Sequence, residues 1–169
     1  MKEEWFRLSK GNIYFLFFYN LFFLLLGIFL SILILSNLSL VHDYSITLKA
    51  IIGSIGFSLI GSTIYYSRKL YKSCIKDLIS EPNNNDNLTL GVLFYFILRP
   101  IFAVAFSLLT ILLIKCSVNV VTVKETQLNE GFIYLSLVLS FFSGLSAGKY
   151  ITGLENKGEN IIGKLLNKI

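Results

Sequence analysis

A single arginine inside an apolar stretch is the residue of this sequence that most clearly suggests a functional role. Arg99 interrupts a run of apolar residues that otherwise extends from Leu90 to Ile114, and Pro100 follows it. Charged side chains within membrane-spanning segments usually face a water-filled cavity or a partner, because hydrocarbon does not solvate them. A helix that is unbroken from Leu90 and kinked at Pro100 therefore predicts Arg99 at a pore or gate.

The same residues have a second interpretation. Proline is favoured at the first position of a helix, so the third span can begin at Pro100, with residues 89–98 as a short apolar segment at the inner interface. Arg99 and Lys115 are sixteen residues apart, which is about 24 Å at helical rise. Their long side chains can then snorkel to opposite faces of one bilayer. The spacing favours this anchoring role over the pore.

Small and hydroxyl residues recur at helical spacing in two other apolar stretches. Small residues let helix backbones approach closely, which stabilises helix association in lipid. The stripes predict tight packing within one chain or an interface between subunits, and hydroxyls facing water in an oligomeric pore are the functional alternative. The packing or interface candidates are Ser140, Gly144, Gly148, Thr152, Gly53 and Gly61. The candidates that join Arg99 in a pore are Ser54, Ser58, Ser62 and Ser107.

Residues suited to catalysis are scarce. The one histidine, His42, is followed by Asp43, and a lone pair of this kind makes neither a metal site nor a catalytic triad. No Asp or Glu lies within an apolar span, which argues against proton- or cation-coupled transport. We therefore expect no enzyme, no cofactor and no metal site.

The elements that must carry these residues are membrane-spanning helices. Of the 169 residues, 54% are hydrophobic and 15% are charged, whereas an ordinary soluble domain is about 25% charged. A spanning helix needs about 20 apolar residues, and four blocks meet that length. The sequence predicts an all-α integral membrane protein with one four-helix domain over residues 1–169. Its expected spans are about 13–35, 48–66, 90–114 and 132–147.

Two basic amphipathic segments flank these spans. Apolar residues after Tyr66 keep helical spacing, so we expect the second helix to extend into the cytoplasm over residues 67–80, where Pro82 ends it. Residues 149–169 are expected to form a C-terminal amphipathic helix on the anionic inner leaflet. The cations that offer a surface to lipid or to a partner are Arg68, Lys69, Lys72, Lys76, Lys164 and Lys168.

The distribution of the 15 Lys and Arg residues sets the orientation. With the N-terminus inside, twelve of them are cytoplasmic and only Lys49, Lys115 and Lys124 lie outside. This is the positive-inside pattern, so we expect a protein of the inner (plasma) membrane with both termini cytoplasmic. The same pattern accounts for the net charge of +5 as attraction to anionic lipid, without direct nucleic-acid binding.

In size and architecture the chain resembles small bacterial membrane proteins, among them bacteriocin immunity proteins, holin-like pore formers and membrane components of anti-phage systems. The resemblance involves no sequence motif. Two functions follow from these features, and we expect the first: a regulated ion-conducting pore or membrane effector in anti-phage defence or stress. The alternative is a non-conducting sensor, immunity or scaffold subunit that recruits a cytoplasmic partner protein. We also expect a homo-oligomer, with a tetramer as the starting hypothesis.

Overall fold

The computed structural model describes residues 6–36, 44–75, 79–80, 86–121 and 130–166, with side-chain detail for 8–36, 44–75, 90–117 and 130–150. The described residues form four α-helices and one pair of two-residue strands. The helices are α1 (Lys10–Leu35), α2 (Ile46–Ile75), α3 (Asp86–Val121) and α4 (Glu130–Leu166). The strands are β1 (Phe6–Arg7) and β2 (Ile79–Ser80).

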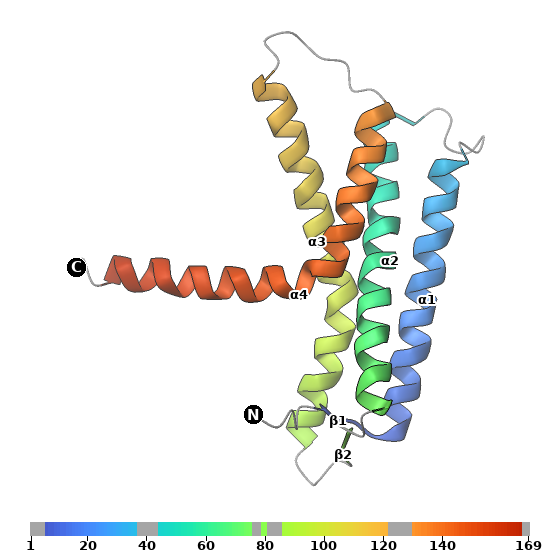
Figure 1. Cartoon of the computed structure of the whole chain (residues 1–169), viewed down its shortest axis with the longest axis vertical. Helices are drawn as coiled ribbons and strands as arrows, with labels where there is room; N and C mark the ends of the chain where they lie inside the picture. Colours follow the sequence, from blue (N-terminus) through green and yellow to red (C-terminus); the bar gives the residue numbers. More distant parts are fainter. Residues whose placement is uncertain (1–5, 37–43, 76–78, 81–85, 122–129, 167–169) are drawn as a thin grey trace.

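All four helices contain a stretch long and apolar enough to cross a membrane. The candidate spans are Lys10–Leu35, Ile46–Ile75, Leu90–Ser117 and Glu130–Tyr150. The predicted all-helical class, with four helices long and apolar enough to span a membrane, is therefore confirmed. α1 begins, α2 ends and α3 begins at one end of the bundle, which we call the base (Figure 1). The other end, where α1 ends and α2 and α4 begin, is the top.

α2 is the central helix and packs against α1, α3 and α4. Half of its most apolar window is buried (50%), whereas only 22% of the corresponding window of α1 is buried. The difference follows from residue size, because α2 carries glycine and serine while α1 carries large aromatic residues such as Phe18, Phe22 and Phe29, which stay exposed. An exposed apolar face of this kind suits contact with lipid chains, and the small residues suit helix packing.

Glycines allow the central helix to approach its neighbours closely. A Cβ built on Gly27 of α1 would lie 2.8 Å from the carbonyl oxygen of Gly56 on α2. Gly61 of α2 and Gly144 of α4 are still closer to the backbone of the facing helix. The small-residue stripes predicted from the sequence are thus used for packing within one chain.

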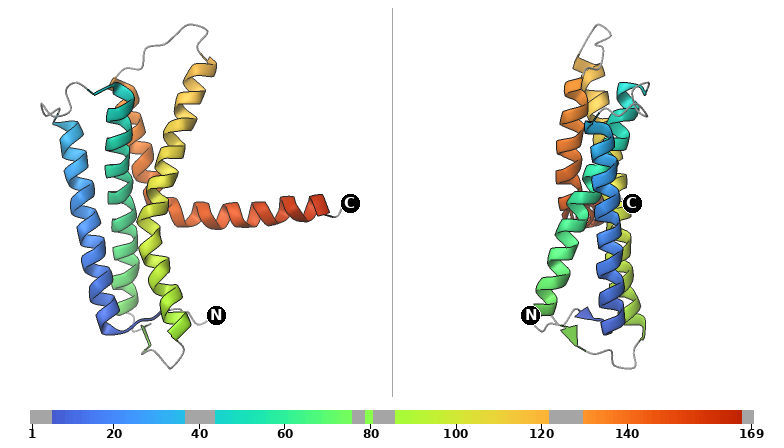
Figure 2. Two further views of the ribbon diagram at one scale, coloured as in Figure 1. Left: turned by 180° about the vertical axis from the view of Figure 1, so that it is seen from behind. Right: turned by 90° about the vertical axis from the view of Figure 1, so that its right-hand side faces the viewer.

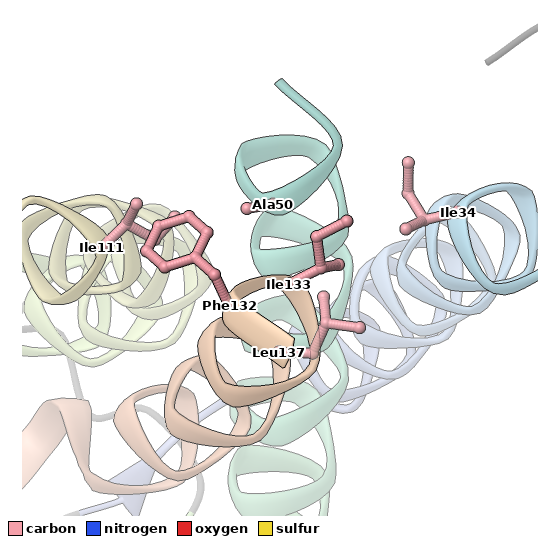
Figure 3. Packing of buried hydrophobic residues seen from close by; sticks show 6 residues of the cluster. All are labelled: Ile34, Ala50, Ile111, Phe132, Ile133 and Leu137. Carbon is pink, nitrogen blue, oxygen red and sulfur yellow. The ribbon is translucent and has the colours of Figure 1, made fainter. Parts of the chain in front are cut away.

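An apolar cluster closes the top of the bundle, and Figure 3 shows how its side chains converge from all four helices. Phe132, Ile133 and Leu137 come from the first turns of α4 and are buried. The other members are Ile34, Ala50 and Ile111. This cluster fills the end at which α4 joins the bundle.

α3 corrects one expectation. It runs unbroken through Pro100, so residues 89–98 belong to the same helix and do not form a separate segment. Proline removes one helical donor and leaves the preceding turn short of a hydrogen bond, and neighbouring side chains can compensate inside a membrane protein. The Tyr19 hydroxyl of α1 donates to the carbonyl oxygen of Ile97, 2.8 Å away, the residue next to Phe96, whose carbonyl loses its helical donor at Pro100.

The base differs from the expected helical extension. α2 ends at Ile75, and residues 79–80 form β2 instead of a last helical turn. β2 pairs in parallel with β1, Phe6 opposite Ile79 and Arg7 opposite Ser80. The pair ties the N-terminal segment to the connection between α2 and α3.

α4 is one helix from Glu130 to Leu166, but its second half leaves the bundle. Figures 1 and 2 show that the C-terminal part of α4 turns away from the other helices at a level between the top and the base. We call residues 151–166 the α4 arm. The arm covers most of the expected amphipathic segment 149–169.

Candidate functional site

Arg99 lies on the buried face of α3. Its side chain is only 8% exposed, and Phe96, Ala103 and Ser107 are buried on the same face. These positions repeat every three or four residues, so they form one stripe along the helix. The structure therefore places Arg99 and Ser107 on one interior stripe, as their spacing predicts, with the arginine enclosed by protein.

Two tyrosines enclose the guanidinium. The Arg99 Cζ atom lies 4.2 Å from the ring centroid of Tyr95 and 5.6 Å from that of Tyr66. Tyr66 is fully buried, and its ring meets that of Tyr95 edge to face at 6.1 Å. A cation over an aromatic face is stabilised by about 0.5–2 kcal/mol, more when desolvated. We call Arg99, Tyr66 and Tyr95 the arginine cage.

One nitrogen of the guanidinium has no hydrogen-bond acceptor among the described residues. The Nη1 atom of Arg99 is buried and has no hydrogen-bond partner there, and the rings of Tyr66 and Tyr95 are stacked against the cation. A guanidinium carries five N–H donors. Burying such a cation without an anion costs several kcal/mol, and the aromatic faces offset only part of that cost.

Gly148 forms the wall of the cage on the α4 side. A Cβ built on Gly148 would lie 2.7 Å from the Tyr66 hydroxyl oxygen and 3.3 Å from Arg99 Nη1. The absence of a side chain at this position lets α4 pass directly over the arginine. The next turn of α4 carries Tyr150, whose ring lies 5.8 Å from that of Phe106 on α3, and the α4 arm begins immediately afterwards.

A second cation lies on the base side of the cage. The Lys69 ammonium is 3.1 Å from the Tyr95 hydroxyl and 4.9 Å from the centroid of the same ring. Arg68 and Lys72, its neighbours on α2, are exposed. Tyr95 therefore stands between a buried guanidinium and the basic surface of the base.

The hydroxyl residues expected to line a pore are enclosed between helices. Ser54, Ser58 and Ser62 are each fully buried, as are Ser107 and Ser140. Ser58 and Ser107 donate to carbonyl oxygens three residues earlier in their own helices. Among the described residues, five serine hydroxyl oxygens are buried without a partner, those of Ser54, Ser62, Ser136, Ser140 and Ser143. These residues line the contact between helices, and none of them faces outward.

The remaining candidates fall into three groups. Gly53 packs against Ile34 and Leu137, near the top cluster. Arg68 and Lys72 present an exposed basic surface at the base. The side chains of Lys76, Thr152, Lys164 and Lys168 lie outside the described part of the chain, as do His42 and Asp43.

Sequence reasoning missed the two tyrosines. Tyr66 is the next member of the series Ser54, Ser58 and Ser62, at the same spacing of four residues, so its burial had a signal in the sequence. Tyr95 lies four residues before Arg99 on the same helix, which is the spacing at which helical side chains meet. The sequence does not show how far α2 is shifted along α3. This register places the Tyr66 ring of α2 beside Tyr95 and Arg99 of α3.

The chain matches no protein-family model, and searches of curated proteins and of solved structures gave no match. The functional argument therefore rests on the geometry of the described residues.

Proposed function

We propose that the chain is a non-conducting plasma-membrane subunit, a sensor, immunity or scaffold protein, that contacts a cytoplasmic partner through its base. The observation that carries this proposal is the backbone contact between α2 and α4. Gly61 and Gly144 lie against the facing backbones, along the stripe that otherwise offers the best lining for a pore. A path for ions needs room for water, and a contact of this closeness leaves none.

The proposed orientation follows from charge. Arg68, Lys69 and Lys72 are at the base, whereas Lys49 and Lys115 are near the top. The positive-inside rule then assigns the base to the cytoplasm. With the α4 arm leaving the bundle above the base, the arm lies along the inner leaflet in this proposal, as expected for a basic amphipathic helix.

The partner surface consists of exposed cations on α2. Arg68 and Lys72 are exposed and four residues apart, so they lie one above the other on the same helix face. Such a pair attracts an acidic surface, on a partner protein or on anionic lipid.

Ion flux and thiol accessibility test the non-conducting proposal together. Purified protein in liposomes should give no flux above that of empty liposomes. In a Cys74→Ser, Cys116→Ser background, Ser140→Cys should resist a water-soluble thiol reagent. A chain that retains Cys74, which is exposed, should react and serves as the matched control. Flux together with labelling at residue 140 would overturn the proposal.

The five partnerless hydroxyls favour a second candidate, the regulated pore. Buried hydroxyls without partners are unfavourable in an apolar interior, and water entering between α2 and α4 would satisfy them. Arg99 would then stand at the inner end of the path and disfavour cations. This candidate predicts stimulus-dependent currents in planar bilayers, with reversed or relaxed selectivity in Arg99→Glu.

The expected homo-oligomer stays a prediction. It rested on small-residue stripes, and these are engaged inside one chain through Gly27, Gly61 and Gly144. Mass measurement in detergent over a range of protein concentrations decides between a monomer and the tetramer hypothesis.

A further inference from the structure

We propose that the arginine cage is a binding site for one phosphate group, supplied by a lipid headgroup or by a small soluble phosphate compound. The inference is independent of the partner-binding proposal, because it concerns the interior of the bundle and not the exposed cations. It begins from an imbalance of charge. Arg99 is 8% exposed and its Nη1 atom has no acceptor, so the site as described holds a cation and lacks its anion.

The donor set indicates phosphate. Arginine presents a planar fork of N–H groups that binds two oxygens of one phosphate at once. Lys69 adds a point charge beside Tyr95, with both cationic centres within 4.9 Å of that ring centroid. The buried Tyr66 hydroxyl has no hydrogen-bond partner and can donate to a third oxygen. A tetrahedral oxyanion can use donors from several directions, which a chloride ion or a planar carboxylate does less well.

The depth of the site is that of lipid headgroups. On α2 the residues change from apolar to basic between Tyr66 and Arg68, next to the cage. The C-terminal part of α4 turns out of the bundle between the top and the base (Figures 1 and 2). Exposed tyrosines, which are common at membrane interfaces, lie beside the cage at Tyr65, next to Tyr66, and at Tyr150, two residues after Gly148. In the proposed orientation, phosphate groups of the inner leaflet are the most concentrated anions at this depth.

Binding to purified protein tests the inference by native mass spectrometry in detergent. The probes are dioleoylphosphatidylglycerol, dioleoylphosphatidylcholine, dioleoylglycerol and inorganic phosphate. We expect one tightly bound phosphatidylglycerol, weaker phosphatidylcholine because choline neutralises the phosphate, and no retained dioleoylglycerol. Inorganic phosphate that binds, or that displaces the lipid, assigns the site to a soluble phosphate compound, whereas lipid binding unaffected by it assigns the site to a headgroup.

Variants separate the cage from general surface charge. Arg99→Gln should weaken phosphatidylglycerol binding by at least about tenfold, because a charge-assisted forked contact is lost. Lys10→Gln removes an exposed cation at the base that belongs neither to the cage nor to the proposed partner surface, and it should leave the affinity within about twofold, since exposed charges contribute little. Equal losses in both variants, or equal retention of dioleoylglycerol, would overturn the proposal.

Circular dichroism shows whether Arg99→Gln folds, and a second variant tests the proposal if it does not. Arg99→Lys keeps the charge and removes the fork, so its phosphatidylglycerol affinity should fall by about tenfold. Binding by Arg99→Lys equal to that of the natural chain would contradict a forked phosphate contact. If neither variant folds, the preference of the natural chain for phosphatidylglycerol over dioleoylglycerol decides the question.

Discussion

Gly144 of α4 lies directly on the backbone of Ser58 of α2, so close that no side chain fits between them. The contact is made by the two helices that share the most extensive interface in the bundle. It fixes the distance between α2 and α4 and, with it, the shape of the serine-lined interior. Substitutions at this contact therefore test the packing on which the functional argument depends.

Gly144→Ala should lower the free energy of unfolding by about 2 kcal/mol relative to Gly91→Ala, because a methyl group at 144 must push two backbones apart. Gly91 is the matched control, since a Cβ there would meet nothing within 4 Å, and it corrects for the general gain of replacing glycine in a helix. Thermal or denaturant unfolding in detergent gives the difference. Equal stabilities for the two variants would show that the backbones are farther apart than described.

Gly148→Ala should disturb the arginine cage through the Tyr66 hydroxyl, which lies 2.7 Å from the position of the added methyl group. We expect a loss of about 1 kcal/mol in the free energy of unfolding, since the buried tyrosine has little room to move. Tyr66→Phe removes the obstructing oxygen, so the loss caused by Gly148→Ala should shrink by at least half in that background. A double-mutant cycle measures this coupling, and additive effects would argue against the contact.

Tyr19→Phe should destabilise the bundle by about 0.5–1.5 kcal/mol, the usual contribution of one hydrogen bond. The lost bond is the one from the Tyr19 hydroxyl to the Ile97 carbonyl oxygen, in the turn that Pro100 leaves short of a donor. Tyr14→Phe is the control, because Tyr14 is 67% exposed. The two unfolding midpoints should differ by a measurable shift, and their coincidence would mean that the hydrogen bond contributes nothing.

The two natural cysteines report the orientation. Cys74 lies near the base end of α2 and Cys116 near the top end of α3, and both are exposed. In single-cysteine variants on intact cells, a membrane-impermeant thiol reagent should label Cys116, and should label Cys74 only after permeabilisation. Labelling of Cys74 alone would reverse the proposed orientation.

The four apolar helices were predictable because crossing the hydrocarbon layer requires a helix of a certain length and apolar composition. The expected first span, 13–35, lies inside α1, and residues 132–147 lie inside α4. Local sequence was misleading at Pro100 and at residue 79. Proline usually marks a helix start, yet α3 continues through it beside Tyr19, and residues 79–80 pair with a segment more than seventy positions earlier. Neither long-range partner is visible in the local pattern.

The arginine cage also depends on long-range contacts that the local sequence does not show. The spacing of Arg99 and Ser107 on one face of α3 could be derived from helical period alone. That Tyr66 would lie over the same cation depends on how α2 is shifted along α3, and apolar helices leave that shift open. Gly148 is one small residue among several in its stripe, and only the structure distinguishes the position that borders the arginine.

The unequal burial of α1 and α2 has a consequence for the order in which a ribosome delivers the chain. In α1, 22% of the apolar window is buried in the bundle, whereas in α2 the share is 50%. The helix that is synthesised first is therefore apolar enough to contact lipid without partners. The second helix exposes serine and glycine until the other helices pack against it. The pairing of Phe6 with Ile79 forms only once α2 has been translated. α2 therefore needs its neighbouring helices to cover its small residues, and the strand pair closes the hairpin of α1 and α2 only after both helices have been synthesised.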